Sequence, residues 1–312
     1  MTITNAMLPS VAIIVDWDTG TEAGLARAEA LLRDLQGEMQ RHAPQFASPP
    51  ELVIVSDLAD SATTKSSVDQ AGGKTGWPGK VTLARAPTPM DYYQKKNHGF
   101  SLSSAEIIVF VDSDLALEPG WLTALVTPFA DPAKNAVTGR THFDVVSRYD
   151  RAMALFWIFE TRESADLVRP TRRLVSNNIA FRRRLFAAMP FPDRPTYRGQ
   201  CGELGRKFQA LGIPLYEATA ARASHPPQRG LGRFVLRAWH AGRDARHYHW
   251  LDGRDGFRTA WSEYAHDRRM VLQRIAARAS WLEANLADRV AARLLGELYY
   301  AIKLAGQLAP LV

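Results

Sequence analysis

The chain has 312 residues, of which 46% are hydrophobic and 23% are charged, as in an ordinary globular protein. Its only cysteine, Cys201, excludes an intramolecular disulfide framework and a cysteine-based zinc site, which is compatible with a cytoplasmic location. The net charge of +7 is concentrated in the last quarter of the chain. No charge-free apolar run is long enough to predict a membrane span, and the first residues lack the pattern of a signal peptide.

The first part of the chain alternates predicted strands and helices. Val11–Val15 and Leu52–Ser56 are expected strands, and an amphipathic helix between them continues to about Arg41. This β-α-β beginning favours a parallel sheet with right-handed crossovers. The other elements expected before residue 105 are a polar, glycine-rich loop over 60–80, a short strand at Val81–Ala84 and a helix over about Asp91–Ser103.

The most informative stretch begins at Ala105. The apolar run Ile107–Val111 predicts a strand buried on both faces, as in a parallel sheet covered by helices. It ends at Asp112-Ser113-Asp114, and ligands of open α/β sheets bind at the carboxyl ends of the strands. Two carboxylates at that edge can hold one Mg²⁺ or Mn²⁺ and leave other positions of the ion for phosphate oxygens. The pattern therefore indicates a site for a diphosphate-bearing substrate.

A second acidic pair competes with this one. Asp16-Trp17-Asp18 also follows an apolar run, Val11–Val15. A chain of this length is expected to contain an Asp-x-Asp tripeptide about once by chance. Position after a strand therefore does not decide between the two pairs.

The second part of the chain is mixed and then becomes helical. Its expected elements are a helix over Pro119–Ala130, a strand at Ala136–Phe143, a helix over Asp150–Glu163, a strand at Leu174–Phe181, a helix beginning at Arg182, a helix over Gly202–Leu211, and strands at Leu215–Ala218 and Ala221–Ser224. From Gly230 the pattern becomes arginine-rich and helical, with interspersed aromatic residues. We expect two domains, residues 1–230 and a helical extension over 231–312.

Several separated segments together resemble one family, the inverting family-2 glycosyltransferases. The matching segments are Lys96-Asn97-His98-Gly99, Ser104 to Asp114, Pro119 to Leu122, Phe129 to Pro132, Val137 to Gly139, Asn177 to Arg182, Leu204 to Phe208 with Gly212, His225, and the helix that runs to Gly242-Arg243-Asp244. The resemblance covers roughly residues 10–245. It implies an α/β protein of the GT-A fold, with a mostly parallel sheet flanked by helices and, in this chain, a C-terminal helical extension. It also implies a nucleotide-diphospho-sugar donor.

The resemblance assigns expected roles to individual residues. Asp112 and Asp114 match the family's pair for Mn²⁺ or Mg²⁺, and His225 is a third candidate ligand of the metal. The expected donor-side residues are Asp16, Trp17, Asp57, Lys96, Asn97 and Ser113. The expected acceptor-side residues are Asn177, Asn178 and Arg198. The resemblance thus favours the Asp112 pair over the Asp16 pair as the metal site.

The chain departs from the family where the catalytic base is expected. The family usually has a Glu-Asp pair before the helix that contains Leu204, and here the corresponding residues are Gln200-Cys201. Neither side chain accepts a proton at neutral pH as a carboxylate does, so Glu203, the nearest acid, is the candidate base. The leading interpretation is an inverting, metal-dependent hexosyl transfer. The alternatives are a non-catalytic donor-binding protein that has lost its base and, with less support, a sugar nucleotidyltransferase, which would need a glycine-rich loop after the first strand.

The C-terminal region carries most of the excess positive charge. Between Arg229 and Arg293 there are 13 arginines, no lysine and seven acidic residues. An anionic membrane surface, a lipid-linked acceptor or an acidic glycan such as a cell-envelope polysaccharide fits this charge, and a solvated helix face explains it equally well. No recognised nucleic-acid-binding pattern accompanies the charge. The last segment, Leu294–Val312, is expected either to lie in a membrane interface on the cytoplasmic side or to pack on the main domain.

Overall fold

The computed structural model describes residues 7–17, 22–59, 61–70, 76–87, 90–162, 165–254 and 256–309. The chain divides into two compact units, each assembled from three stretches. Unit 1 comprises Met1–Thr141, Arg162–Asp193 and Gln200–Ser224, and unit 2 comprises His142–Thr161, Arg194–Gly199 and His225–Val312. Unit 2 thus includes two stretches that precede residue 230, and a domain boundary at that residue stays a prediction.

The described strands form one mixed sheet in the order β3-β2-β1-β4-β8-β6-β9-β5, and β7 pairs with β9. The strands are β1 (Val11–Asp16), β2 (Glu51–Ser56), β3 (Val81–Arg85), β4 (Ile107–Asp112), β5 (Ala116–Leu117), β6 (Ala136–Phe143), β7 (Val168–Thr171), β8 (Asn178–Arg182) and β9 (Leu215–His225). Strands β3, β2, β1 and β4 are mutually parallel, and β8 pairs antiparallel to both β4 and β6. The parallel half is the β-α-β arrangement that the sequence predicts.

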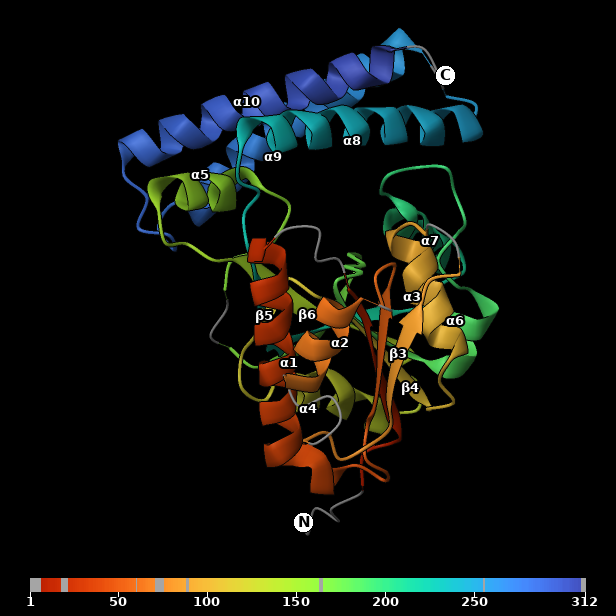
Figure 1. Ribbon diagram of the computed structural model, residues 1–312. Helices are drawn as coiled ribbons and strands as arrows, with labels where there is room; N and C mark the ends of the chain where they lie inside the picture. The colour runs from red at the N-terminus through yellow and green to blue at the C-terminus, as the bar shows by residue number, and fades with distance from the viewer. Residues whose placement is uncertain are drawn as a thin grey trace. The chain divides into compact units, whose positions relative to one another are not determined.

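Helices cover both faces of the sheet in unit 1 (Figure 1). One face carries α1 (Glu22–His42), α2 (Ala62–Gln70) and α4 (Trp121–Val126), and the other carries α3 (Tyr92–Ser101), α6 (Arg183–Ala188) and α7 (Gln200–Ala210). Short 3-10 helices follow α1 at Ala43–Gln45 and α4 at Thr127–Ala130. The predicted α/β class with a helix-covered sheet is therefore confirmed.

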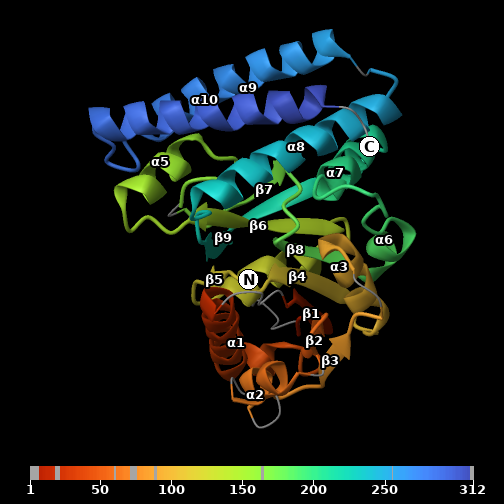
Figure 2. The same ribbon diagram turned by 45° about the horizontal axis from the view of Figure 1, so that its top comes forward.

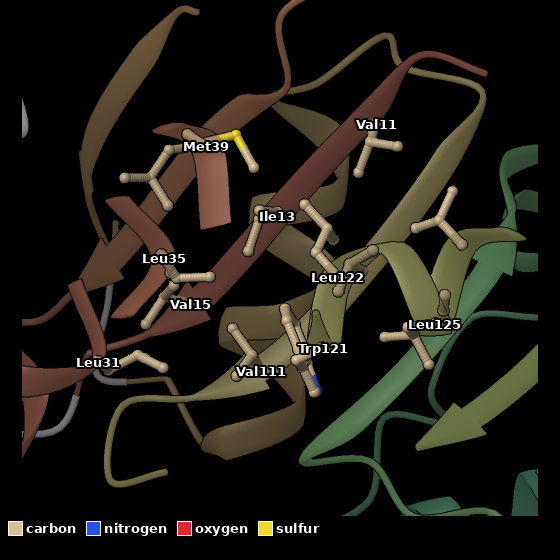
Figure 3. Packing of buried hydrophobic residues seen from close by; sticks show 14 of the residues in the cluster. Val11, Ile13, Val15, Leu31, Leu35, Met39, Val111, Trp121, Leu122 and Leu125 are labelled. Carbon is tan, nitrogen blue, oxygen red and sulfur yellow. The ribbon is translucent and has the colours of Figure 1, made fainter. Parts of the chain in front are cut away.

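Alternation along each parallel strand divides the core into two layers. Ile13 and Val15 of β1 face α1, where they pack with Leu31 and Leu35 (Figure 3). Ile14, between them, joins the cluster on the opposite face of the sheet. Each such side chain is fully buried and stabilises the fold by about 2 kcal/mol. An uninterrupted apolar run is therefore what these strands require.

Unit 2 is helical. It contains α5 (Arg148–Phe156), α8 (Leu231–Leu251), α9 (Phe257–Arg278) and α10 (Leu286–Leu308). Helix α10 runs between α8 and α9 and also packs on α5 (Figure 2). The C-terminal end of α5 is bound by Arg278, whose Nη1 donates to the carbonyl oxygens of Ala154 at 2.9 Å and Trp157 at 2.7 Å. A cation at this end also complements the helix dipole.

Several expected elements differ from the structure. The loop expected over 60–80 contains α2, whose serines and threonines gave no helical pattern in the sequence. The strand expected from Leu174 begins at Asn178 because Ser176 and Asn177 form a turn. The two short strands expected after Gly212 are one strand, β9.

Two further differences concern the end of α5 and the short strands β5 and β7. Helix α5 ends at Phe156, well before Glu163, because Trp157 leaves the helical conformation. The short strands β5 and β7 were not expected, and both form by pairing with β9. Pairing with a distant strand leaves no local pattern in so short a segment.

Candidate functional site

Three neighbouring parallel strands end at aspartates on one edge of the sheet. Asp16 is the last residue of β1 and Asp112 the last of β4, and the two are partners in the strand register. Asp57 follows the last residue of β2, which pairs with β1 on its other side. Because parallel strands bring their carboxyl ends to the same edge, these acidic residues gather where α/β proteins bind ligands.

A single lysine joins two of these aspartates. Lys96 Nζ lies 2.7 Å from Asp16 Oδ1 and 2.8 Å from Asp112 Oδ1, and the lysine side chain is completely buried. Burial by itself lowers the pKa of an amine, but the charges of Asp112 and Asp16 outweigh it and raise the pKa of Lys96 above its usual value. Lys96 is therefore a permanent ammonium group inside the sheet edge.

Helix α3 supplies two more contacts to the same edge. Tyr92 lies one helical turn before Lys96, and its hydroxyl donates to Asp112 Oδ1 at 2.6 Å. Lys95, next to Lys96, forms an ion pair with Asp57. One helix thus contacts the aspartates of all three strand ends. The start of α3 is fixed by Asp91, whose side chain accepts hydrogen bonds from the backbone of Tyr93 and Gln94.

The segment Lys96-Asn97-His98-Gly99 also anchors α3. Asn97 Nδ2 donates to the Phe191 carbonyl oxygen at 2.8 Å, and Asn97 Oδ1 accepts from the Phe191 amide at 3.2 Å. A Cβ atom at Gly99 would lie 2.4 Å from a methyl carbon of Ile14, so only glycine lets the helix approach β1 this closely. Both ends of the Asn97 amide are used in this anchoring, which argues against its expected contact with the donor.

The turn after β4 carries the rest of the predicted acidic pair. Ser113 is buried, Asp114 is half-buried, and Arg27 Nε of α1 donates to the Asp114 carbonyl oxygen at 2.8 Å. Among the described residues, no three His, Cys, Asp or Glu side chains are grouped to hold a metal ion. Mg²⁺ in phosphate sites is typically held by one or two carboxylates together with substrate oxygens. The Asp112–Asp114 turn fits a cation of that kind and not one enclosed by protein ligands.

Three more of the predicted contact residues have buried side chains, as Asp16, Lys96 and Ser113 do. The Trp17 ring lies in the core cluster on the α1 face, which argues against its expected contact with a nucleotide base. Asn178 is fully buried, accepting from Trp121 Nε1 at 2.9 Å and donating to the Ala221 carbonyl oxygen at 3.1 Å. Asn177 Oδ1 accepts from Thr141 Oγ1 at 3.2 Å. We therefore assign Asn178 a structural role instead of an acceptor contact. Asp18 of the competing pair lies outside the described residues.

Two predicted residues belong to unit 2. His225 Nδ1 donates to the Pro226 carbonyl oxygen at 2.6 Å, which places the lone pair of a neutral imidazole on Nε2. The Arg198 guanidinium stacks over the Tyr197 ring, and the backbone amides of both residues donate to Asp244. The pKa of Asp244 is raised by its burial, against the effect of these two amides. Asp244 thus fixes the segment that carries Arg198.

The predicted base region lies at the start of α7. Gln200 is completely buried, and Glu203 is half-buried in the first turn of the helix. Tyr92 and Lys95 were not predicted as site residues. Their spacing from Lys96 places them near it on the same helix, but this spacing indicates a shared site only once α3 is known to lie across the strand ends.

Comparison with known proteins identifies the segment that builds this edge. Residues 41–189 match the model of glycosyl transferase family 2. This segment belongs to that family. It contains β2, α3, β4 and the Asp112–Asp114 turn, so the family-2 match includes the lysine and one of its two aspartates. No curated protein matches the sequence.

Solved structures agree with the fold. The mannosyltransferase PcManGT from Pyrobaculum calidifontis, solved with GDP-Man and Mn²⁺, is 19% identical with a TM-score of 0.61, over 97% of this chain and 88% of that one. GalNAc-T7, solved with UDP, GalNAc and Mn²⁺, is 13% identical with a TM-score of 0.52, over 71% of this chain and 44% of that one. These likenesses confirm the expected GT-A fold. None of the helices that the structure describes combines the length and apolar character needed to span a bilayer.

Proposed function

We propose that this protein is a family-2 glycosyltransferase that moves a hexosyl group from a nucleotide-diphospho-sugar to a hydroxyl group of a glycan or lipid-linked acceptor, in one displacement that inverts the anomeric centre. The observation that carries the proposal is the edge at which Asp16, Lys96 and Asp112 meet, since this edge lies at the carboxyl ends of β1 and β4 and is built partly by the family-2 segment.

The charges at the edge support distinct roles for its residues. Asp112 is held by Lys96 and Tyr92 through one oxygen, so its carboxylate has a fixed orientation. We assign Asp16 and Asp57 to the nucleoside, whose base and ribose offer N–H and O–H donors to carboxylates. Buried Lys96 serves this site by holding two carboxylates in place.

The metal is assigned to the turn after β4. We place Mn²⁺ or Mg²⁺ at Asp114, with Asp112 as a second ligand candidate, because carboxylate oxygens suit both ions. His225 belongs to unit 2, and its role as a ligand stays an expectation from the family resemblance. The Mn²⁺ bound in the PcManGT and GalNAc-T7 structures supports this choice. A cation there supplies positive charge to the leaving nucleoside diphosphate.

We assign to Glu203 the role of the base that takes up the proton of the acceptor hydroxyl. Glu203 is half-buried in the first turn of α7 and is the acid nearest to Gln200 and Cys201 in the sequence, and a carboxylate is a group that can act as a base. The buried Gln200 favours the second candidate function, a donor-binding protein without transfer activity, since an amide at this position cannot take up the proton.

Donor turnover and donor binding together test the proposal. The protein is incubated with a panel of nucleotide-sugars and either Mn²⁺ or Mg²⁺, and release of nucleoside diphosphate is measured. We expect Asp114→Asn to lower turnover by roughly a hundredfold or more and chelation to abolish it, because the leaving charge loses its counterion. Asp131→Asn, at an exposed turn of unit 1, is the matched control. Turnover that survives both chelation and Asp114→Asn would contradict the metal assignment.

Glu203→Gln separates the two candidate functions. Loss of transfer by roughly a hundredfold or more with unchanged donor affinity supports Glu203 as the base. Donor binding without transfer in the unaltered protein supports the non-catalytic function. NMR of the product decides whether the anomeric configuration is inverted.

A further inference from the structure

Tryptophans divide sharply between the early and late parts of the chain. Trp17, Trp77, Trp121 and Trp157 are buried, with exposed fractions of 9% or less. The four that follow residue 230 are Trp239, Trp250, Trp261 and Trp281, and their exposed fractions lie between 37% and 64%. A soluble protein gains stability by burying such large rings, so exposure of all four indicates a surface that an apolar environment covers.

Two of these tryptophans flank one turn. Trp250 is near the end of α8, and Phe257 and Trp261 are in the first turns of α9. The rings of Phe257 and Trp261 stack at 6.0 Å between centroids, and both are more than half exposed. Arg254 and Arg258 are exposed between and beside them. Aromatic rings next to arginines are typical of segments that lie at the boundary between lipid and water.

Helix α10 presents a second apolar feature, which we call the α10 stripe. Its residues are Leu286, Val290, Leu294, Leu298 and Leu308, and each is between 43% and 78% exposed. The first four recur every four residues, which places them along one side of the helix. The opposite side contains the buried residues that pack on α5, α8 and α9. The stripe therefore has no cover among the described residues of unit 2.

The charge around these features is strongly positive. Exposed arginines of this region include Arg254, Arg258, Arg268, Arg269, Arg289 and Arg293. Of the acidic residues of the same region, Asp244 and Asp288 are buried, and Glu263 and Asp267 bind Lys303. Asp252 and Glu297 form ion pairs with Arg254 and Arg268. Exposed arginines of this region therefore outnumber its exposed acids, which include Asp252 and Glu283.

We propose that helices α8–α10 bind the surface of an anionic lipid bilayer, with the exposed tryptophans and the α10 stripe entering the interfacial layer and the arginines contacting lipid phosphates. Apolar leucines contribute nothing to contact with a nucleic acid, whereas both the leucines and the arginines have partners at a membrane. The absence of a spanning helix among the described residues agrees with attachment from one side. The inference concerns unit 2 and does not depend on the proposed reaction.

Sedimentation with sucrose-loaded vesicles tests the inference on the full chain. We expect binding to phosphatidylcholine vesicles that contain phosphatidylglycerol, little binding to phosphatidylcholine alone, and a blue shift of tryptophan emission on binding. Leu294→Ser with Leu298→Ser should weaken partitioning by roughly tenfold or more, since two buried leucines are lost. The matched control is Leu211→Ser with Leu167→Ser, two similarly exposed leucines of unit 1.

Charge reversal tests the electrostatic part. Arg258→Glu with Arg293→Glu should weaken partitioning by roughly twentyfold or more, because each surface arginine strengthens binding to an anionic leaflet several-fold. Arg172→Glu with Arg206→Glu changes the net charge equally at exposed positions of unit 1 and should have a much smaller effect.

Three outcomes would overturn the inference. The first is no binding of the unaltered chain to anionic vesicles. The second is vesicle binding that an oligonucleotide displaces and that the leucine changes leave intact, which assigns the arginines to nucleic acid. The third is a dimer that the leucine changes dissociate without vesicle binding, which assigns the α10 stripe to a second copy of the chain.

Discussion

Lys96 and Lys95 are neighbours in sequence with very different surroundings. Lys96 is fully buried between Asp16 and Asp112, whereas Lys95 pairs with Asp57, whose side chain is half exposed. Removing a buried ammonium group lowers stability mainly because it leaves carboxylates without a counterion in a low-dielectric interior, which is costly. An ion pair with an exposed partner contributes little.

We therefore expect Lys96→Met to lower the free energy of unfolding by about 3–5 kcal/mol and to abolish donor binding, because Asp16 and Asp112 would repel one another. Lys95→Met, which keeps most of the side-chain volume, should cost at most about 1 kcal/mol. Urea unfolding followed by circular dichroism measures both. Equal destabilisation by the two changes would contradict the expected difference between the contributions of Lys96 and Lys95 to stability.

The candidate site could be predicted from the sequence only in part. Asp16 and Asp112 follow unbroken apolar runs, so their placement at strand ends is a local property of the sequence. Their contact with Lys96 depends on how α3 is rotated over β1 and β2, which tertiary packing decides. For the same reason Asn97 looks like a ligand contact in the sequence and instead binds the backbone of Phe191.

Helices α8 and α10 pack closely because two glycines face the crossing. A Cβ atom at Gly242 would lie 2.0 Å from the Lys303 carbonyl oxygen, and one at Gly306 would lie 2.5 Å from that of Trp239. Both clashes are with backbone, which cannot rotate away as a side chain can. The crossing therefore requires glycine at both positions.

We expect Gly242→Ala to destabilise unit 2 by about 1–3 kcal/mol, since the helices must move apart. Gly232→Ala in the same helix meets no atom within 4 Å and should be neutral or slightly stabilising. Differential scanning calorimetry of the two variants measures the contrast. A similar shift of the unfolding temperature in both would exclude the crossing as the cause.

At the level of elements, prediction succeeded where burial leaves a regular pattern. The parallel strands have apolar runs and the C-terminal helices have helical periodicity, so both were anticipated. Helix α2 was not, because it is mostly polar and buries few side chains, among them Thr64 and Val68. The short strands β5 and β7 form through β9, so no pattern within a few residues could reveal them.

In the whole molecule, each unit holds a lysine between two acids, and in unit 2 this is Lys303. Its Nζ lies 2.8 Å from Glu263 Oε1 and 2.7 Å from Asp267 Oδ2. Burial opposes the charge, but Asp267 and Glu263 raise the pKa of Lys303 above 10.5. Burial likewise opposes ionisation of Glu263, yet Lys303 holds its pKa below 4.5. For Asp267 burial is the stronger effect and raises the pKa above 3.8.

These directions predict how the stability of unit 2 depends on pH. The stabilisation from Lys303 is complete below pH 10.5 and is lost as the pH rises through its folded pKa, and that from Glu263 is complete above pH 4.5 and is lost as the pH falls through its folded pKa. Lys303→Met leaves Glu263 and Asp267 without their ammonium partner, so both pKa values should rise and acid should become stabilising.

We therefore expect α10 of the Lys303→Met variant to be better protected from hydrogen exchange under mildly acidic than under mildly alkaline conditions, after correction for intrinsic rates. The unaltered protein should gain less protection with acid, because Glu263, whose pKa is lowered, opposes the effect of Asp267. Peptides from α1 in unit 1 provide the internal reference. Identical pH profiles for α10 in the two proteins would contradict the prediction.

The order in which unit 2 is synthesised has a consequence for the nascent chain. Helix α5 leaves the ribosome long before α10, yet the Phe156 ring contacts Tyr299 of α10, and Arg278, which binds the carboxyl end of α5, is at the end of α9. Until α9 and α10 have been translated, the apolar face of α5 therefore has no partner from these helices. A premature stop before α10 would leave the part of that face that packs on α10 uncovered, and we expect such fragments to aggregate or be degraded even when all strands of the sheet are present.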